Sequence, residues 1–171
     1  DFVITPETYF SEGYGENIDY FEFSRLHDSL NSYLNQFENT NLISGIQFYK
    51  LYQNQNDKPT KSANLVRDGM WVDYFNSSIN ISANTDFEYN HKSKLVVGSE
   101  YMPMKSLLEP IIGTIMIDLG GTIRSLGTQH YSERKIFKHS KKNLKTAPIV
   151  CYETIDGEYV ANYVSLGANF I

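Results

Sequence analysis

The feature that most constrains the fold is an apolar stripe of helical period, followed directly by a segment that alternates like a strand. Between residues 17 and 37, apolar side chains recur every three or four positions and polar side chains fill the gaps. The stripe consists of Phe23, Leu26, Leu30, Tyr33, Leu34 and Phe37. This spacing predicts one long amphipathic helix that packs along one side. Residues 42–52 then predict a strand, with Ile46 and Phe48 on one face.

The middle of the chain predicts a short helix and then strands. Apolar residues within 63–75 recur at roughly helical spacing, which favours a helix despite Gly69. Strands are expected around 87–89, 94–104 and 111–119, and the last two suit an antiparallel pair.

The end of the chain predicts a hairpin. Residues 147–153 and 159–166 are strand candidates, and Asp156-Gly157 between them is a favoured two-residue turn. Runs of strands with helices at one end indicate an α+β fold with a mainly antiparallel sheet.

Composition limits the class of protein. The chain has 171 residues, of which 41% are hydrophobic, so it can form a core of its own. Its 13 Tyr and 10 Phe favour a sheet-containing fold. The net charge of −5 argues against nucleic acid as a general partner, although residues 134–145 carry six Lys and Arg and no acid. We interpret this basic run as a solvated surface segment.

Motifs of catalysis are not recognisable. Phosphate-binding glycine loops and the G-x-S-x-G elbow of serine hydrolases are absent, and the four His residues are too dispersed for a metal motif. Cys151 lies in a predicted strand without a nearby base, so we expect a buried, inert thiol. No cofactor or metal is expected, and we do not expect this segment to be an enzyme.

A binding site is the remaining candidate. Arg67, Trp71 and Tyr74 share a face if their segment is helical, and they combine a forked cation with aromatic walls. Three further residues on neighbouring predicted strands could close the same cavity, namely Tyr89, Tyr101 and Asp118. The alternative is that Trp71 and Tyr101 are ordinary core or rim residues.

The element order resembles an extracellular Cache (PAS-like) sensor domain of bacterial membrane-bound histidine kinases and related receptors. The resemblance rests on the long helix, the strand at 41–49 (NLISGIQFY), the segment with Trp71 and the run at 110–119 (PIIGTIMIDL). It implies a Cache-like sensor domain with its N-terminal helix at residues 1–126. Residues 127–171 would form a reduced membrane-proximal subdomain or a terminal hairpin region.

The resemblance implies a function in transmembrane signalling. The domain would lie on the extracellular face of the bacterial cell membrane, held there by flanking segments, and would bind a sugar, an amino acid or an organic acid. A homodimer would relay binding to a cytoplasmic output module, such as a kinase. Because the chain starts at Asp1 rather than Met, we expect an excised piece of such a receptor. Amino-acid-binding members place the Arg closer to a Trp-Tyr pair, so the ligand class stays open.

Two other classes of function stay open. The chain could be a secreted or surface adhesion domain whose Tyr-rich face binds a protein or glycan. It could also be a small α+β hydrolase or transferase, for which folding would have to bring an acid pair or a His together. His91 and Asp118 are the residues that we would test for such an activity.

Overall fold

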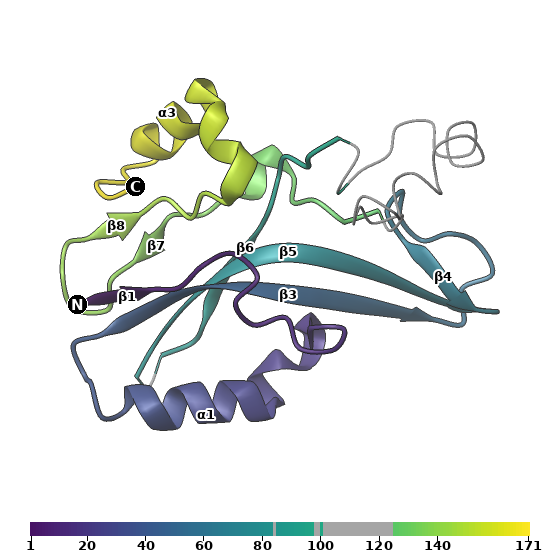
Figure 1. Cartoon of the computed structure of the whole chain (residues 1–171), viewed down its shortest axis with the longest axis horizontal. Coiled ribbons are helices and arrows are strands. Elements are labelled where there is room, and N and C mark those ends of the chain that lie inside the picture. Colours follow the sequence, from purple (N-terminus) through teal and green to yellow (C-terminus); the bar gives the residue numbers. More distant parts are fainter. Residues whose placement is uncertain (84, 98–99, 101–124) are drawn as a thin grey trace.

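A six-stranded mixed sheet is the centre of the fold. The computed structural model describes residues 1–83, 85–97, 100 and 125–171 (Figure 1). In this part of the chain the strand order is β1-β3-β5-β4, β2 also pairs with β3, and β6 also pairs with β5. The strands are β1 (Phe2–Ile4), β2 (Glu16–Asn17), β3 (Asn41–Gln53), β4 (Asn64–Arg67), β5 (Met70–Ser82) and β6 (Glu88–His91).

The long pair β3–β5 sets the directions of the other strands. Its antiparallel register runs from Asn41 opposite Ser82 to Gln53 opposite Met70. β4 and β6 are antiparallel to β5, whereas β1 and β2 are parallel to β3. The predicted α+β class and the strand at 42–52 are therefore confirmed, and the sheet is mixed rather than mainly antiparallel.

The two faces of β3 and β5 pack against different parts of the chain. On one face, Ile46, Phe48 and Ile79 are fully buried against Phe21 and form the main apolar core. On the other face, Asn41 and Asn80 donate to the carbonyl of Lys138, over 3.3 Å and 3.0 Å. In Figure 1, α1 and the C-terminal segment accordingly lie on opposite sides of the central strands.

The prediction of one long N-terminal helix is wrong. The structure instead has a 3₁₀ helix, η1 (Ile18–Phe23), and a separate helix, α1 (Arg25–Leu34). Ser24 divides them because its backbone is extended and its Oγ accepts the N–H of His27 over 3.1 Å, as an N-cap does. Part of the apolar stripe is consequently exposed; Phe23 is 81% exposed.

The predicted helix at 63–75 is also wrong, because this segment forms the hairpin of β4 and β5. Gly69 has a φ of +71°, and the turn brings Arg67 opposite Met70. Glycine reaches this left-handed conformation without the steric cost of a side chain. The partner strand β3 then extends β5 to Ser82, so that cross-strand pairing replaces any helical preference.

The predicted C-terminal hairpin around Asp156-Gly157 is wrong as well. The structure has a 3₁₀ helix, η3 (Cys151–Ile155), followed by α3 (Gly157–Ser165). The Asp156 carboxylate accepts the N–H of Tyr159 over 2.9 Å, so the Asp-Gly pair begins a helix instead of a turn. A small two-stranded sheet lies earlier, formed by β7 (Phe137–Lys138) and β8 (Lys145–Thr146), after the 3₁₀ helix η2 (Tyr131–Glu133).

Some predictions lie outside the described residues. These include the predicted strand at 111–119, and also the strand at 94–104 apart from residues 94–97 and Glu100. None of the helices within the described ranges has the length and apolar character needed to cross a lipid bilayer.

Candidate functional site

The predicted ligand-binding residues lie at separate places. Arg67 is exposed at the end of β4. Trp71 and Tyr74 lie three positions apart on β5, and side chains at that spacing in a strand point to opposite faces. Trp71 donates its indole N–H to the carbonyl of Gln55 over 3.1 Å, while Tyr74 is only 8% exposed.

Tyr89 lies on β6 and belongs to the apolar core beside α1. It is opposite Ile79 in the sheet, and its ring contacts those of Phe48 and Phe87. Tyr74 points to the other face, so the four described candidates do not share one cavity. Tyr101 and Asp118 lie outside the described residues. The ligand-binding role of this set stays a prediction.

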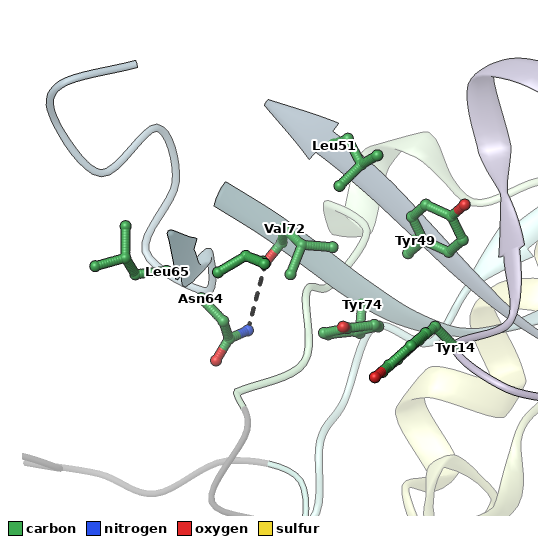
Figure 2. A pocket seen from close by; sticks show the side chains of 8 residues that line it. Tyr14, Tyr49, Leu51, Asn64, Leu65, Val72 and Tyr74 are labelled. Carbon is green, nitrogen blue, oxygen red and sulfur yellow. Dashed lines mark hydrogen bonds between the residues drawn. The ribbon is translucent and has the colours of Figure 1, made fainter. Parts of the chain in front are cut away.

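Tyr74 does line one pocket of about 440 Å³ at the β4 end of the sheet. Figure 2 shows the rings of Tyr14 and Tyr74 close to one another, with Tyr49 on the neighbouring strand. The other described lining residues are Leu51, Asn64, Leu65, Val66 and Val72. These described lining residues include no charged side chain, so they offer a mainly apolar binding surface lined by three tyrosine rings.

A second cavity, of about 340 Å³, brings together side chains that can take part in a chemical reaction. Its described lining includes Glu7 and Cys151, with the polar residues Ser44, Ser77 and Ser78. A carboxylate and a thiol that open into one cavity are the components of nucleophilic catalysis.

Lys92 supplies a positive charge to this site. Its side chain is fully buried, and its Nζ lies 2.7 Å from Oε1 of Glu100 and 3.4 Å from Oε1 of Glu7. Burial alone would lower the pKa of the Lys92 ammonium. The hydrogen bond to Glu100 and the charges of Glu100, Glu7 and Cys151 outweigh burial and raise this pKa. Lys92 is therefore held as a cation near the thiol.

The polar face of the sheet positions the lysine and the first carboxylate. Lys92 follows β6, and its N–H donates to the carbonyl of Asn76 over 2.8 Å. The Asn76 amide also donates to the Glu7 carboxylate. Glu7 lies in the turn after β1, which is bound to β3 by the N–H of Gly45 donating to the carbonyl of Pro6 over 3.2 Å. Strands β3 and β5 thus bring Glu7 and Lys92 together.

Cys151 is placed differently from its prediction. The expected buried strand residue is an exposed thiol at the first position of η3, so that prediction is wrong. Its φ of +50° lies in the left-handed region, which a residue with a side chain occupies at a cost of about 1–2 kcal/mol. Such strain persists when surrounding contacts hold it, and it is common at functional sites.

Together, these four residues form the candidate site: Glu7, Lys92, Glu100 and Cys151. The arrangement contains a nucleophile, carboxylates that can accept a proton, and a fixed cation that can stabilise negative charge. Among the described residues, no group of three or more His, Cys, Asp and Glu side chains could hold a metal ion.

Sequence reasoning missed this site because its members are far apart in the chain. Glu7 and Lys92 are separated by 85 positions, and no spacing rule connects them. The lone Cys151 was the available signal, but its base and cation come from other elements and meet it only in the fold.

Comparisons with known proteins give one partial similarity. No protein-family model matches the sequence. The chain is 31% identical over 106 residues to an apolipoprotein N-acyltransferase of Wigglesworthia glossinidia brevipalpis, in a match that covers 57% of this chain. The match covers 19% of that protein, so the chain spans about a fifth of the relative's length.

Proposed function

We propose that this chain carries out acyl transfer through a thioester on Cys151. The observation that carries the proposal is the buried Lys92 ammonium, held by two carboxylates near an exposed cysteine in left-handed backbone. An isolated buried ammonium is costly, and two carboxylates at 2.7 Å and 3.4 Å lower that cost. Stability alone does not require such a triad beside a thiol.

In the first step, the sulfur of Cys151 attacks the carbonyl carbon of an acyl ester. The carboxylate of Glu7, which lines the same cavity as Cys151, accepts the thiol proton. An S–C bond forms, the carbonyl oxygen becomes an oxyanion, and the C–O bond to the leaving group then breaks. Glu7 returns the proton to the departing alkoxide, which leaves as an alcohol.

Lys92 stabilises the charge that develops in this step. A buried ammonium acts more strongly on an oxyanion than one in water, because the surrounding protein screens it less. Glu100 keeps Lys92 in place: its Oε1 accepts from the ammonium and its Oε2 accepts the N–H of Val96 over 2.8 Å. Glu100 is thus a positioning residue, and Lys92 acts on the reacting atoms.

In the second step, an acceptor attacks the thioester carbonyl. An amine forms an amide bond, the C–S bond breaks, and the thiol regains a proton as the amine loses one. The similarity to a protein named as an N-acyltransferase supports an amine as the acceptor. Water in place of the amine would give a hydrolase with the same acyl-enzyme intermediate.

The test uses p-nitrophenyl butyrate as acyl donor and intact-mass spectrometry. We expect a burst of p-nitrophenol and a mass increase of one butyryl group, located on Cys151 by peptide mapping. Cys151→Ala should abolish both signals while the fold is unchanged, and the matched surface variant Ser165→Ala should retain them. If the native chain shows neither burst nor adduct at any pH between 6 and 9, the proposal fails.

The ligand-sensing function implied by element order stays a prediction, with its membrane location, its dimer and its small-solute ligand. It requires no covalent intermediate. A butyryl adduct on Cys151 therefore favours acyl transfer over sensing.

A further inference from the structure

Glu153 is a buried carboxylate that the proposed chemical steps do not use. It lies in η3, two positions after Cys151, and is only 1% exposed. Its Oε1 accepts the N–H groups of Ser93 and Lys94, over 2.7 Å and 3.1 Å, and the hydroxyl of Tyr159 over 2.7 Å. Its Oε2 accepts the N–H of Val150 over 3.0 Å. A buried charge is tolerated when it is hydrogen-bonded in this way.

These four hydrogen bonds connect the two halves of the candidate site. Ser93 directly follows Lys92, and Val150 directly precedes Cys151. One side chain thus binds the backbone beside the cation and the backbone beside the nucleophile, although Ser93 and Glu153 are 60 positions apart. The Glu153 carboxylate therefore links the segment that carries Lys92 to the segment that carries Cys151.

Glu153 also holds the strained backbone of Cys151 from both sides. Its side chain accepts from Val150, and its own N–H donates to the Val150 carbonyl over 3.2 Å. This reciprocal pair closes a loop around Cys151, whose φ is +50°. Residues in such sparsely populated conformations persist only when neighbouring contacts determine them.

The side of Glu153 that faces α3 is fixed by a second set of contacts. Tyr159, which donates to Glu153, is 1% exposed and lies under the guanidinium of Arg134, 4.4 Å from the ring centre. Lys94 forms an ion pair with Asp156, the residue that caps α3. These contacts hold the carboxylate in one orientation, so that its hydrogen bonds can fix the positions of both segments.

We propose that Glu153 is a positioning residue for acyl transfer, holding the Lys92 and Cys151 segments at a fixed separation through its four hydrogen bonds. This inference rests on the proposed thioester chemistry at Cys151. Displacement of a reacting group by about 1 Å can lower a rate by about 100-fold, so loss of this contact should be visible in the rate of acylation.

The test is Glu153→Gln, which keeps the shape of the side chain. An amide has one acceptor oxygen, so its NH₂ group faces either the Val150 N–H or the three donors on the other side. At least one hydrogen bond is lost and a donor meets a donor. Glu158→Gln is the matched control, because Glu158 is an exposed glutamate of the same segment.

Two readouts separate positioning from folding. We expect Glu153→Gln to acylate Cys151 with p-nitrophenyl butyrate about 100-fold more slowly, with folded far-UV circular dichroism at the assay temperature. We also expect the backbone amides of Ser93 and Lys94 to exchange hydrogen at least about tenfold faster than in Glu158→Gln. An unchanged acylation rate or unchanged amide exchange would overturn the inference.

Tyr159→Phe covers the case in which Glu153→Gln does not fold. It removes one donor and keeps the carboxylate, so acylation should fall by about threefold to tenfold, as loss of a single hydrogen bond does. A native rate in Tyr159→Phe, combined with native exchange at Ser93, would also contradict the inference. If the native chain forms no thioester, the proposed function fails, whereas the exchange experiment still measures the contact made by Glu153.

Discussion

The ammonium of Lys92 lies 2.7 Å from the carboxylate of Glu100, and no part of the lysine side chain is exposed. Glu7 completes the ion cluster at 3.4 Å. Two carboxylates around one cation give the cluster a negative formal charge. Removal of the cation therefore leaves both carboxylates without their counter-charge, and the Glu100 side chain is only 15% exposed.

This arrangement predicts a large effect for Lys92→Met, which has a similar volume without the charge. We expect the free energy of unfolding to fall by about 3–5 kcal/mol, because a buried charge loses its partner. Urea unfolding followed by circular dichroism measures the change. Lys50→Met is the control, since the Lys50–Asp19 pair is 3.7 Å long and both side chains are nearly half exposed. The control should lose under about 1 kcal/mol, and equal losses in the two variants would contradict the role given to Lys92.

The close contact between β3 and the Glu7 turn gives a second prediction. A Cβ added at Gly45 would lie 2.5 Å from the Pro6 carbonyl oxygen and 2.6 Å from the Cα of Glu7. Gly45→Ala must therefore displace the turn that carries Glu7. We expect acylation of Cys151 to slow by about tenfold or more, together with a loss of stability of about 1–3 kcal/mol.

Gly157→Ala is the matched control for this substitution. A Cβ at Gly157 meets no atom within 4 Å, and the residue lies at the start of α3. Its stability should be unchanged or should rise by up to about 1 kcal/mol, since alanine is the better helix former. The acylation rate is measured by stopped-flow release of p-nitrophenol. A rate in Gly45→Ala equal to that of the native chain would show that the position of the Glu7 turn does not affect catalysis.

The local sequence of this chain shows the alternation of a strand but not the cap that divides a helix. The strand at 42–52 was predictable because Ile46 and Phe48 alternate with half-exposed residues along a long pairing with β5. The helix at 17–37 was predicted as continuous because the spacing of apolar residues does not show where a helix begins or ends at a capping residue. Ser24 ends that continuity through a side-chain hydrogen bond to the N–H of His27.

Two of the wrong predictions have the same physical origin. Asp156-Gly157 suits a hairpin turn and also suits a helix N-cap followed by an open first position, and local sequence does not choose between them. The apolar residues around Trp71 likewise fit a period of 3.6 and a period of 2. Pairing with β3 and β6, which involves distant parts of the chain, decided the outcome for β5.

The candidate site was the least predictable feature. Glu7 was not among the predicted site residues, and Cys151 was predicted to be a buried strand residue. Their chemical meaning depends on Lys92, which reaches Glu7 only after β1, β3, β5 and β6 pair into one sheet. Spacing along the chain therefore contains little information about this site.

The ligand-sensing prediction gives an experiment of its own. A solute that binds the native chain should stabilise it by about 2.7 kcal/mol when its concentration is 100 times its dissociation constant. A thermal-shift screen of sugars, amino acids and organic acids would detect such a change. Trp71→Ala should remove such a shift. Phe23→Ala, at a residue that is 81% exposed and outside the predicted site, should retain it. A shift that survives Trp71→Ala would show that the predicted residues are the wrong ones.

The last prediction concerns acid stability and the buried ring of His91. Its Nδ1 lies 2.6 Å from the Ser77 hydroxyl, and its ring stacks on Phe75 with centres 4.2 Å apart. Burial lowers the pKa of His91 from 6.5 to about 4. Between these two values the unfolded chain binds the proton and the folded chain does not, so stability falls as the pH falls through this window.

We expect the contribution of His91 to the free energy of unfolding to fall by about 2 kcal/mol between pH 7.5 and pH 5. Urea unfolding at both pH values measures this loss. His91→Gln removes the titrating ring and can still accept from Ser77, so its stability should depend less on pH by the same amount. His130→Gln, at an exposed histidine, should keep the full dependence of the native chain. Parallel pH profiles for the native chain and His91→Gln would show that the ring is not the group that titrates, because no other substituted group distinguishes the two proteins.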